Sequence, residues 1–177
     1  MKLATQVFVS HTKPEAGKIS KINDRHFWKP TGGLWTSTLN EEGGQWLRWL
    51  HRQGYKLDDP RWGGKVWLLE PKEANLFVVW SPKEYRELTE RFPYEMEDRE
   101  SVASMGPFVD WEKLLEFYDG IYVPNPWTWR FGHDDLGAGM FFYGMDAECT
   151  CWFRWRFTGE PQTTDPAPFL AELNGGA

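Results

Sequence analysis

Alternation of apolar and polar residues predicts a chain rich in short β-strands. The clearest alternation runs from Cys149 to Phe157, where every second residue is a cysteine or an aromatic and the positions between include Thr150 and two arginines. A period of two is typical of a strand with one buried face. We expect this strand to form a hairpin with Met140–Met145. Other strands are expected at Gln6–Ser10, from the Gly32–Gly33 turn to Thr38, and at Lys65–Glu70, Leu76–Trp80 and Ile121–Val123.

Three helices are predicted from apolar faces and capping residues. The first spans about 44–53, because Trp46, Leu47, Trp49 and Leu50 share one helical face. The second begins at a Ser81 cap followed by Pro82 and runs to about Arg91. The third is capped by Asp110 and closed by Gly120. Residues 15–32, 93–107 and 124–139 are expected to be loops, the first with at most one helical turn.

A length of 177 residues supports one sizeable core and is short for two domains. We therefore expect a single α+β domain over residues 1–157. Residues 158–177 are rich in Pro, Thr and Gly and are expected to form a frayed tail. The mixture of strands and helices indicates the α+β class without fixing the order of the strands.

Composition narrows the choice of ligand. Aromatic residues make up 17% of the chain and include 12 tryptophans, so some rings are expected to line a groove where a flat ligand could stack. The net charge of -6 argues against extended binding to a phosphate backbone. Residues 1–32 nevertheless hold six Lys or Arg against two acids, a local excess that could serve a pyrophosphate or simply form a solvated edge.

The two cysteines, Cys149 and Cys151, are too few for a disulfide framework or a zinc site. They are expected to be buried free thiols in a reducing compartment. The chain contains no apolar run typical of a signal peptide or a membrane span. A cytoplasmic protein without membrane contact is the resulting expectation.

Glu148 is the candidate catalytic acid, because it heads the strongest predicted strand. Side chains on rigid elements keep their geometry better than side chains on loops. Asp146, two residues earlier, is its nearest competitor. Both could also be solvated acids in a turn, which is the simpler interpretation and the one that the alternation alone favours.

The order of three motifs resembles the ADP-ribosyltransferase fold, especially its small, divergent bacterial and phage members. VFVSHT ends a first strand in His11 and Thr12, and GGLWTS leads into the helix of Trp46. YDGI precedes a late strand, which Glu148 heads. This resemblance covers most of residues 6–157. It implies two small antiparallel-rich sheets that form a cleft with flanking helices.

The resemblance also implies roles for individual residues. NAD would be the substrate, and Glu148 or Asp146 would stabilise the oxocarbenium-like ribose formed when the nicotinamide bond breaks. His11 would bind a ribose hydroxyl and the Thr12 backbone the nicotinamide amide. The remaining pocket residues would be Gly33 and Leu34 of the glycine motif, the donors Thr36 and Ser37, the stacking rings Trp35 and Trp46, and the pyrophosphate-binding Arg25 and Lys29. No metal is implied.

The function implied is NAD-dependent mono-ADP-ribosylation of a macromolecule, either a protein or a nucleic acid, by a toxin, an antiphage effector or a phage counter-defence protein. One alternative is a non-catalytic protein on the same fold that occludes a partner through an aromatic surface. Weaker alternatives are a hydrolase that uses Cys149 or Cys151 with His133 and Asp134, and a metal site at His133, Asp134 and Asp135.

Overall fold

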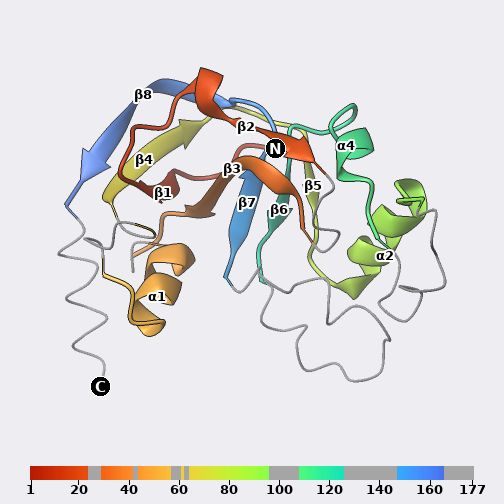
Figure 1. Ribbon diagram of the computed structural model, residues 1–177, viewed down its shortest axis with the longest axis horizontal. Helices are drawn as coiled ribbons and strands as arrows, with labels where there is room; N and C mark the ends of the chain where they lie inside the picture. Colours follow the sequence, from red (N-terminus) through yellow and green to blue (C-terminus); the bar gives the residue numbers. More distant parts are fainter. Residues whose placement is uncertain are drawn as a thin grey trace.

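A computed structural model describes residues 1–23, 29–41, 44–56, 61, 64–95, 108–125 and 147–165. Within these residues the chain forms one mixed sheet of eight strands with three α-helices and a short 3-10 helix, Ala16–Lys18 (Figure 1). The strands are β1 Gln6–Ser10, β2 Ser20–Asn23, β3 Thr31–Thr38, β4 Lys65–Pro71, β5 Leu76–Val78, β6 Gly120–Val123, β7 Cys149–Trp152 and β8 Phe157–Thr164. The helices are α1 Gln45–Arg52, α2 Pro82–Arg91 and α4 Trp111–Leu114.

The strand order is β5-β6-β7-β3-β1-β4-β8, with β2 beside β3. Among the pairings of the described strands, only that of β5 with β6 is parallel. The predicted α+β class is confirmed, but the prediction of two separate sheets is wrong. The reason is the central strand β3, which pairs with β7 along Leu34 to Thr36 and with β1 at Ser37 and Thr38. These pairings join both halves into one sheet.

Strand β7 is buried on both faces, whereas the alternation predicted one buried face. It lies between β3 and β6, and all four of its residues are buried. Cys151 packs into one apolar cluster and Trp152 into another on the opposite face. The predicted strand Cys149–Phe157 is two strands, because β7 ends at Trp152 and the chain turns before β8. Met140–Met145, its expected partner, lies outside the described residues.

Strand β8 continues to Thr164 and pairs with β4 over the length of both strands. The sheet therefore includes residues 158–164, which the sequence assigned to a frayed tail. The alternation in β8 is weak because its side chains are mostly exposed at the edge of the sheet. Strand β2 was also missed, since Ile22 is its one buried residue.

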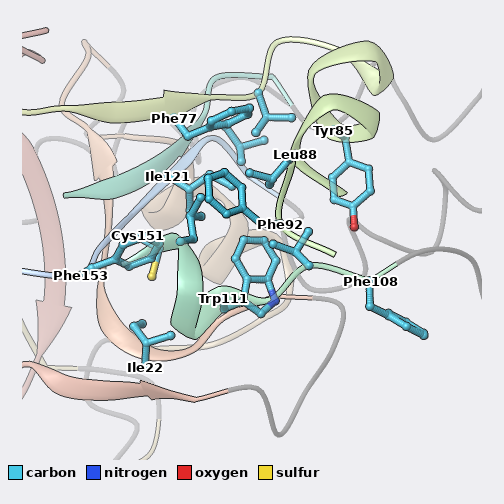
Figure 2. Packing of buried hydrophobic residues seen from close by; sticks show 14 of the residues in the cluster. Ile22, Phe77, Tyr85, Leu88, Phe92, Phe108, Trp111, Ile121, Cys151 and Phe153 are labelled. Carbon is cyan, nitrogen blue, oxygen red and sulfur yellow. The ribbon is translucent and has the colours of Figure 1, made fainter. Parts of the chain in front are cut away.

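The largest apolar cluster lies between the β5–β6–β7 half of the sheet and the helices α2 and α4 (Figure 2). Leu88 and Phe92 come from the α2 region, and Trp111 comes from α4. They pack with Ile121 of β6 and Cys151 of β7. The other half of the sheet is covered by α1, whose Leu47 packs on Val7 and Val66. Burial of these side chains fixes the helices on the sheet.

The predicted N-terminal caps Ser81 and Asp110 are confirmed. The Ser81 hydroxyl accepts a hydrogen bond from the Lys83 backbone N–H at 3.3 Å and donates to the Glu84 carboxylate at 2.5 Å. The Asp110 carboxylate accepts from the Lys113 N–H at 2.7 Å. Helix α4 ends at Leu114, and Gly120, which was expected to close this helix, is instead the first residue of β6. Of the helices in the described ranges, none is long and apolar enough to cross a membrane.

Candidate functional site

Glu148 lies directly before β7 and is held by two neighbouring elements. Glu148 is buried, with 5% of the residue's surface exposed. One carboxylate oxygen accepts from the Thr38 backbone N–H at 2.8 Å, and the other accepts from the Thr38 hydroxyl at 2.7 Å. The Glu148 N–H donates to the side-chain oxygen of Gln45 in α1 at 2.9 Å. Glu148 is therefore fixed where the end of β3, the start of β7 and the start of α1 meet.

Burial raises the pKa of the Glu148 carboxyl, although hydrogen bonds from Thr38 and the Tyr122 hydroxyl act in the opposite direction. The carboxylate in turn raises the pKa of Tyr122, as a contribution added to burial of that phenol. A carboxyl group whose pKa is raised towards neutrality exchanges a proton more readily at physiological pH than an exposed one. Glu148 therefore has a property common among catalytic acids and bases.

A directed chain of hydrogen bonds ends on Glu148. The Trp152 indole N–H donates to the Thr36 hydroxyl at 2.8 Å, and that hydroxyl donates to the Gln6 side-chain oxygen at 2.7 Å. The Gln6 amide nitrogen then donates to the Thr38 hydroxyl at 3.2 Å, which donates to Glu148. Indole can only donate, so the chain starts at Trp152, and it ends on a Glu148 carboxyl oxygen, which accepts.

Thr150 adds a hydroxyl on the Glu148 face of the sheet. Thr150 is fully buried, lies in β7 two residues after Glu148, and pairs in register with Thr36 and Tyr122. Its hydroxyl oxygen has no hydrogen-bond partner among the described residues. Buried polar atoms are usually paired. The Thr150 hydroxyl is therefore a polar group that the described residues leave unpaired in the interior of the protein, on the same face of the sheet as Glu148.

A cavity of about 220 Å³ lies along α1, next to Glu148. Its lining residues are Gln45, Arg48, Trp49, Arg52, Gln53 and Ala147. Gln45 binds the Glu148 backbone, and Ala147 precedes Glu148 in the chain. Trp49 stacks between Trp46, at 4.8 Å between ring centroids, and Tyr55, at 6.0 Å. A basic and aromatic surface thus adjoins the buried acid.

The sequence-predicted pocket is only partly assembled. Ser37 and Trp46 lie near Glu148, because they are the chain neighbours of Thr38 and Gln45, which bond it. The Trp46 N–H also donates to the Ser37 hydroxyl at 3.3 Å. His11 and Thr12 follow the far end of β1, about 17 Å along the strand from Gln6, which pairs with Thr38. Both are exposed. The structure therefore does not bring the predicted ribose-binding and nicotinamide-binding residues to the candidate acid.

Backbone conformation and close packing explain why glycines occupy positions 32 and 33. Gly32 and Gly33 have positive φ angles of 95° and 72°. A Cβ at Gly32 would lie 2.3 Å from the Lys21 carbonyl oxygen, and one at Gly33 would lie 2.6 Å from the Cys151 sulfur. The motif therefore allows β2 and β7 to approach β3 closely. Leu34, beside it, packs in the apolar cluster with Trp152.

Lys29 and Trp35 lie on the opposite face of the sheet from Glu148. The Lys29 ammonium is 5.6 Å from the Trp35 ring centroid, within the range of a cation–π contact. The Trp35 indole N–H donates to the Gly32 carbonyl at 2.9 Å, and its ring packs against the cluster in Figure 2. Both side chains are thus engaged within the protein. Arg25 and Asp146 lie outside the described residues.

The structure argues against thiol chemistry. Cys149 and Cys151 are free and buried. Burial raises the pKa of both thiols, so neither forms the thiolate that a nucleophilic mechanism needs at neutral pH. The described residues contain no group of three or more potential metal ligands. His133, Asp134 and Asp135, named for the hydrolase and the metal site, lie outside them.

Sequence reasoning missed the residues that hold Glu148. Gln6 reads as a polar residue at a strand end, and Gln45 as an ordinary helix-surface residue. Thr38 carried a usable signal, since it extends the hydroxyl run Thr36–Ser37 by one position at the end of a strand. Arg48 and Arg52 share one helical face with Gln45, which the apolar face of the same helix obscured.

Comparisons with known proteins found no match: no family model, curated protein or solved structure resembles the chain closely enough to be assigned.

Proposed function

We propose that the protein is an NAD-dependent mono-ADP-ribosyltransferase in which Glu148 is the catalytic carboxylate. The observation that carries the proposal is the geometry of Glu148, a buried acid held by Thr38 and Gln45 beside a basic cavity. A fixed carboxylate can stabilise positive charge on a ribose without reorganising during the reaction. The motif order that resembles this superfamily supplies the reaction class.

In the proposed reaction the bond between the nicotinamide nitrogen and the ribose carbon breaks, and its electron pair leaves with nicotinamide. The ribose carbon becomes oxocarbenium-like, and ionised Glu148 stabilises its positive charge. A nucleophile of the acceptor then bonds to that carbon. The raised pKa of Glu148 suits it to receive the proton that the nucleophile loses.

The internal contacts revise the other roles. The Thr36 hydroxyl belongs to the chain that ends on Glu148, and the Ser37 hydroxyl accepts the Trp46 N–H, so both act on the site's geometry. Thr150 and Tyr122 become the nearer candidates to contact the ribose, because their hydroxyls lie on the Glu148 face. His11 remains a candidate only for a part of NAD distant from the reacting carbon.

Substitution of Glu148 by Gln tests the proposal. The variant keeps the size of the side chain and removes the charge, so nicotinamide release should fall about a hundredfold or more. Chromatographic detection of nicotinamide measures this rate, and transfer of radiolabelled ADP-ribose to lysate identifies the acceptor. Glu90→Gln, on the exposed face of α2, is the matched control and should keep the wild-type rate. Wild-type nicotinamide release by the Glu148→Gln variant would refute the assignment.

A non-catalytic binding protein is the second candidate. The exposed rings of Trp80 and Phe117, at 60% and 53%, are the observation that favours it, because large exposed apolar side chains are common in interfaces. Under this alternative Glu148 serves only to join β3, β7 and α1. Wild-type protein incubated with labelled NAD would then release no nicotinamide and label nothing, with or without lysate.

A further inference from the structure

The surface of α1 and the turn after it is positively charged. Residues 45–56 contain Arg48, Arg52 and Lys56 and no acid, in a chain whose net charge is -6. Acidic residues flank this segment in the sequence at 41, 42, 58 and 59, but none of the residues lining the cavity is acidic. The cavity therefore favours an anionic ligand.

The polar residues of this surface share one face of the helix. Gln45, Arg48, Arg52 and Gln53 are spaced by three, four and one residues, so with Trp49 they form a single stripe along the cavity. Guanidinium groups bind phosphate oxygens through two parallel hydrogen bonds. The two side-chain amides can bind the hydroxyl and carbonyl groups of a sugar or a base.

Aromatic rings continue the stripe. Trp46 and Trp49 stack with an interplanar angle of 10°, and Trp49 and Tyr55 stack at 29°. Nearly parallel rings next to cations are the combination that binds single-stranded nucleic acids, where bases stack on aromatic side chains and cations contact phosphates. The whole-chain charge of -6 excludes a long electrostatic footprint, so only a short segment of strand would be held.

We propose that α1 binds a short segment of single-stranded nucleic acid, and that this strand is the acceptor for ADP-ribose. The proposal rests on the proposed function for the transfer step but not for the binding step. The cavity volume of about 220 Å³ lies below the roughly 300 Å³ at which pockets begin to enclose a drug-sized ligand. It therefore suits one phosphate and its ribose better than a whole dinucleotide such as NAD.

The position of the cavity explains how a bound strand would reach the acid. Gln45 lines the cavity and binds the Glu148 backbone, and Ala147 connects the cavity wall to Glu148 along the chain. If Arg48 and Arg52 held one nucleotide, the next nucleotide of the strand would lie at the end of β3 and the start of β7, beside Glu148. That is where ADP-ribose would form its new bond.

Binding can be tested without NAD, by fluorescence anisotropy with 12-nucleotide labelled DNA and RNA strands, a duplex of the same sequence and a phosphopeptide. We expect single strands to bind more tightly than the duplex and the phosphopeptide. Arg52→Gln should weaken single-strand binding about tenfold and lower the salt dependence by about one counterion. Arg52→Lys should restore the salt dependence, since it keeps the charge, but only part of the affinity, since it lacks the guanidinium fork.

Arg86→Gln, on the exposed face of α2, is the matched control and should bind like wild type. Equal binding by Arg52→Gln and wild type, or preference for the duplex or the phosphopeptide, would overturn the proposal. A difference between the DNA and RNA arms identifies the natural strand. Strand binding without nicotinamide release would refute the proposed function and the transfer step that rests on it, but not the binding step, whereas nicotinamide release without strand binding would refute this proposal alone.

Discussion

Replacement of Gln6 by Leu should destabilise the protein by about 2–3 kcal/mol. The change keeps the side chain's approximate volume and removes three hydrogen bonds, those with Ala4, Thr36 and Thr38. Each contributes roughly 1 kcal/mol net. The Thr36 hydroxyl, which is buried, would also lose its acceptor, whereas the exposed Ala4 could bind water. At this chain length the melting temperature should fall by about 5–10 °C.

The same variant should raise the pKa of Glu148 further. Without Gln6, the Thr38 hydroxyl loses the donor that polarises it and donates more weakly to the carboxylate. Urea unfolding measures the stability, and carbon NMR of the glutamate carboxyl groups measures the pKa. Gln162→Leu, on the exposed edge strand β8, is the matched control and should change the stability by less than about 0.5 kcal/mol. A Gln6→Leu variant as stable as this control would show that the chain of hydrogen bonds contributes nothing.

Two further predictions concern the frame around the site. Burial acts to raise the pKa of Asp119, but hydrogen bonds from Arg156 and the Asn75 N–H outweigh it and lower the pKa. Stability from Asp119 is therefore present above the ordinary aspartate pKa and is lost as pH falls through the folded value. Asp119→Asn should cost about 2 kcal/mol at pH 7 in urea unfolding, with a gap that closes in acid; a constant gap would contradict this. Gly33→Ala should destabilise more than Gly159→Ala, because both have positive φ but only Gly33 would place a Cβ against Cys151. Equal melting temperatures for the two would show that close packing is not why β3 needs this glycine.

The helix starts were predictable where one capping residue determines them. Ser81 and Asp110 predicted helix starts because their side chains cap the helix from within a few residues. The sheet order was not predictable, since the pairing of β3 with both β1 and β7 depends on contacts between distant residues. The end of β7 was misjudged for the same reason: the Phe153 N–H donates to the Asp119 carbonyl, outside the regular ladder.

The candidate acid was predictable and its surroundings were not. Glu148 could be chosen because it precedes a strong strand, which is local information. Gln45 bonds the Glu148 backbone from 103 residues away, Gln6 reaches the carboxylate only through Thr38, and no periodicity marks either glutamine. Pairing of β1 with β3 decides that Gln6, rather than His11, lies at the Glu148 end of the sheet. The motif order therefore names residues at both ends of β1 as one pocket, whereas the strand pairing places only the Gln6 end beside Glu148.

The contacts of Glu148 bear on the proposal that this residue is a catalytic acid rather than a purely structural one. A neutral residue at this position would avoid the cost of burying a charge, but only a carboxylate offers one acceptor oxygen to the Thr38 N–H and another to the Thr38 hydroxyl. A carboxyl is present here although burial raises its pKa, and four residues, Trp152, Thr36, Gln6 and Thr38, form a chain of hydrogen bonds that donates towards it. The orphaned hydroxyl of Thr150 lies on the same face. Preorganised donors around a buried acid are the arrangement that the proposed catalytic carboxylate requires, and nicotinamide release by the Glu148→Gln variant decides between that role and a scaffold role.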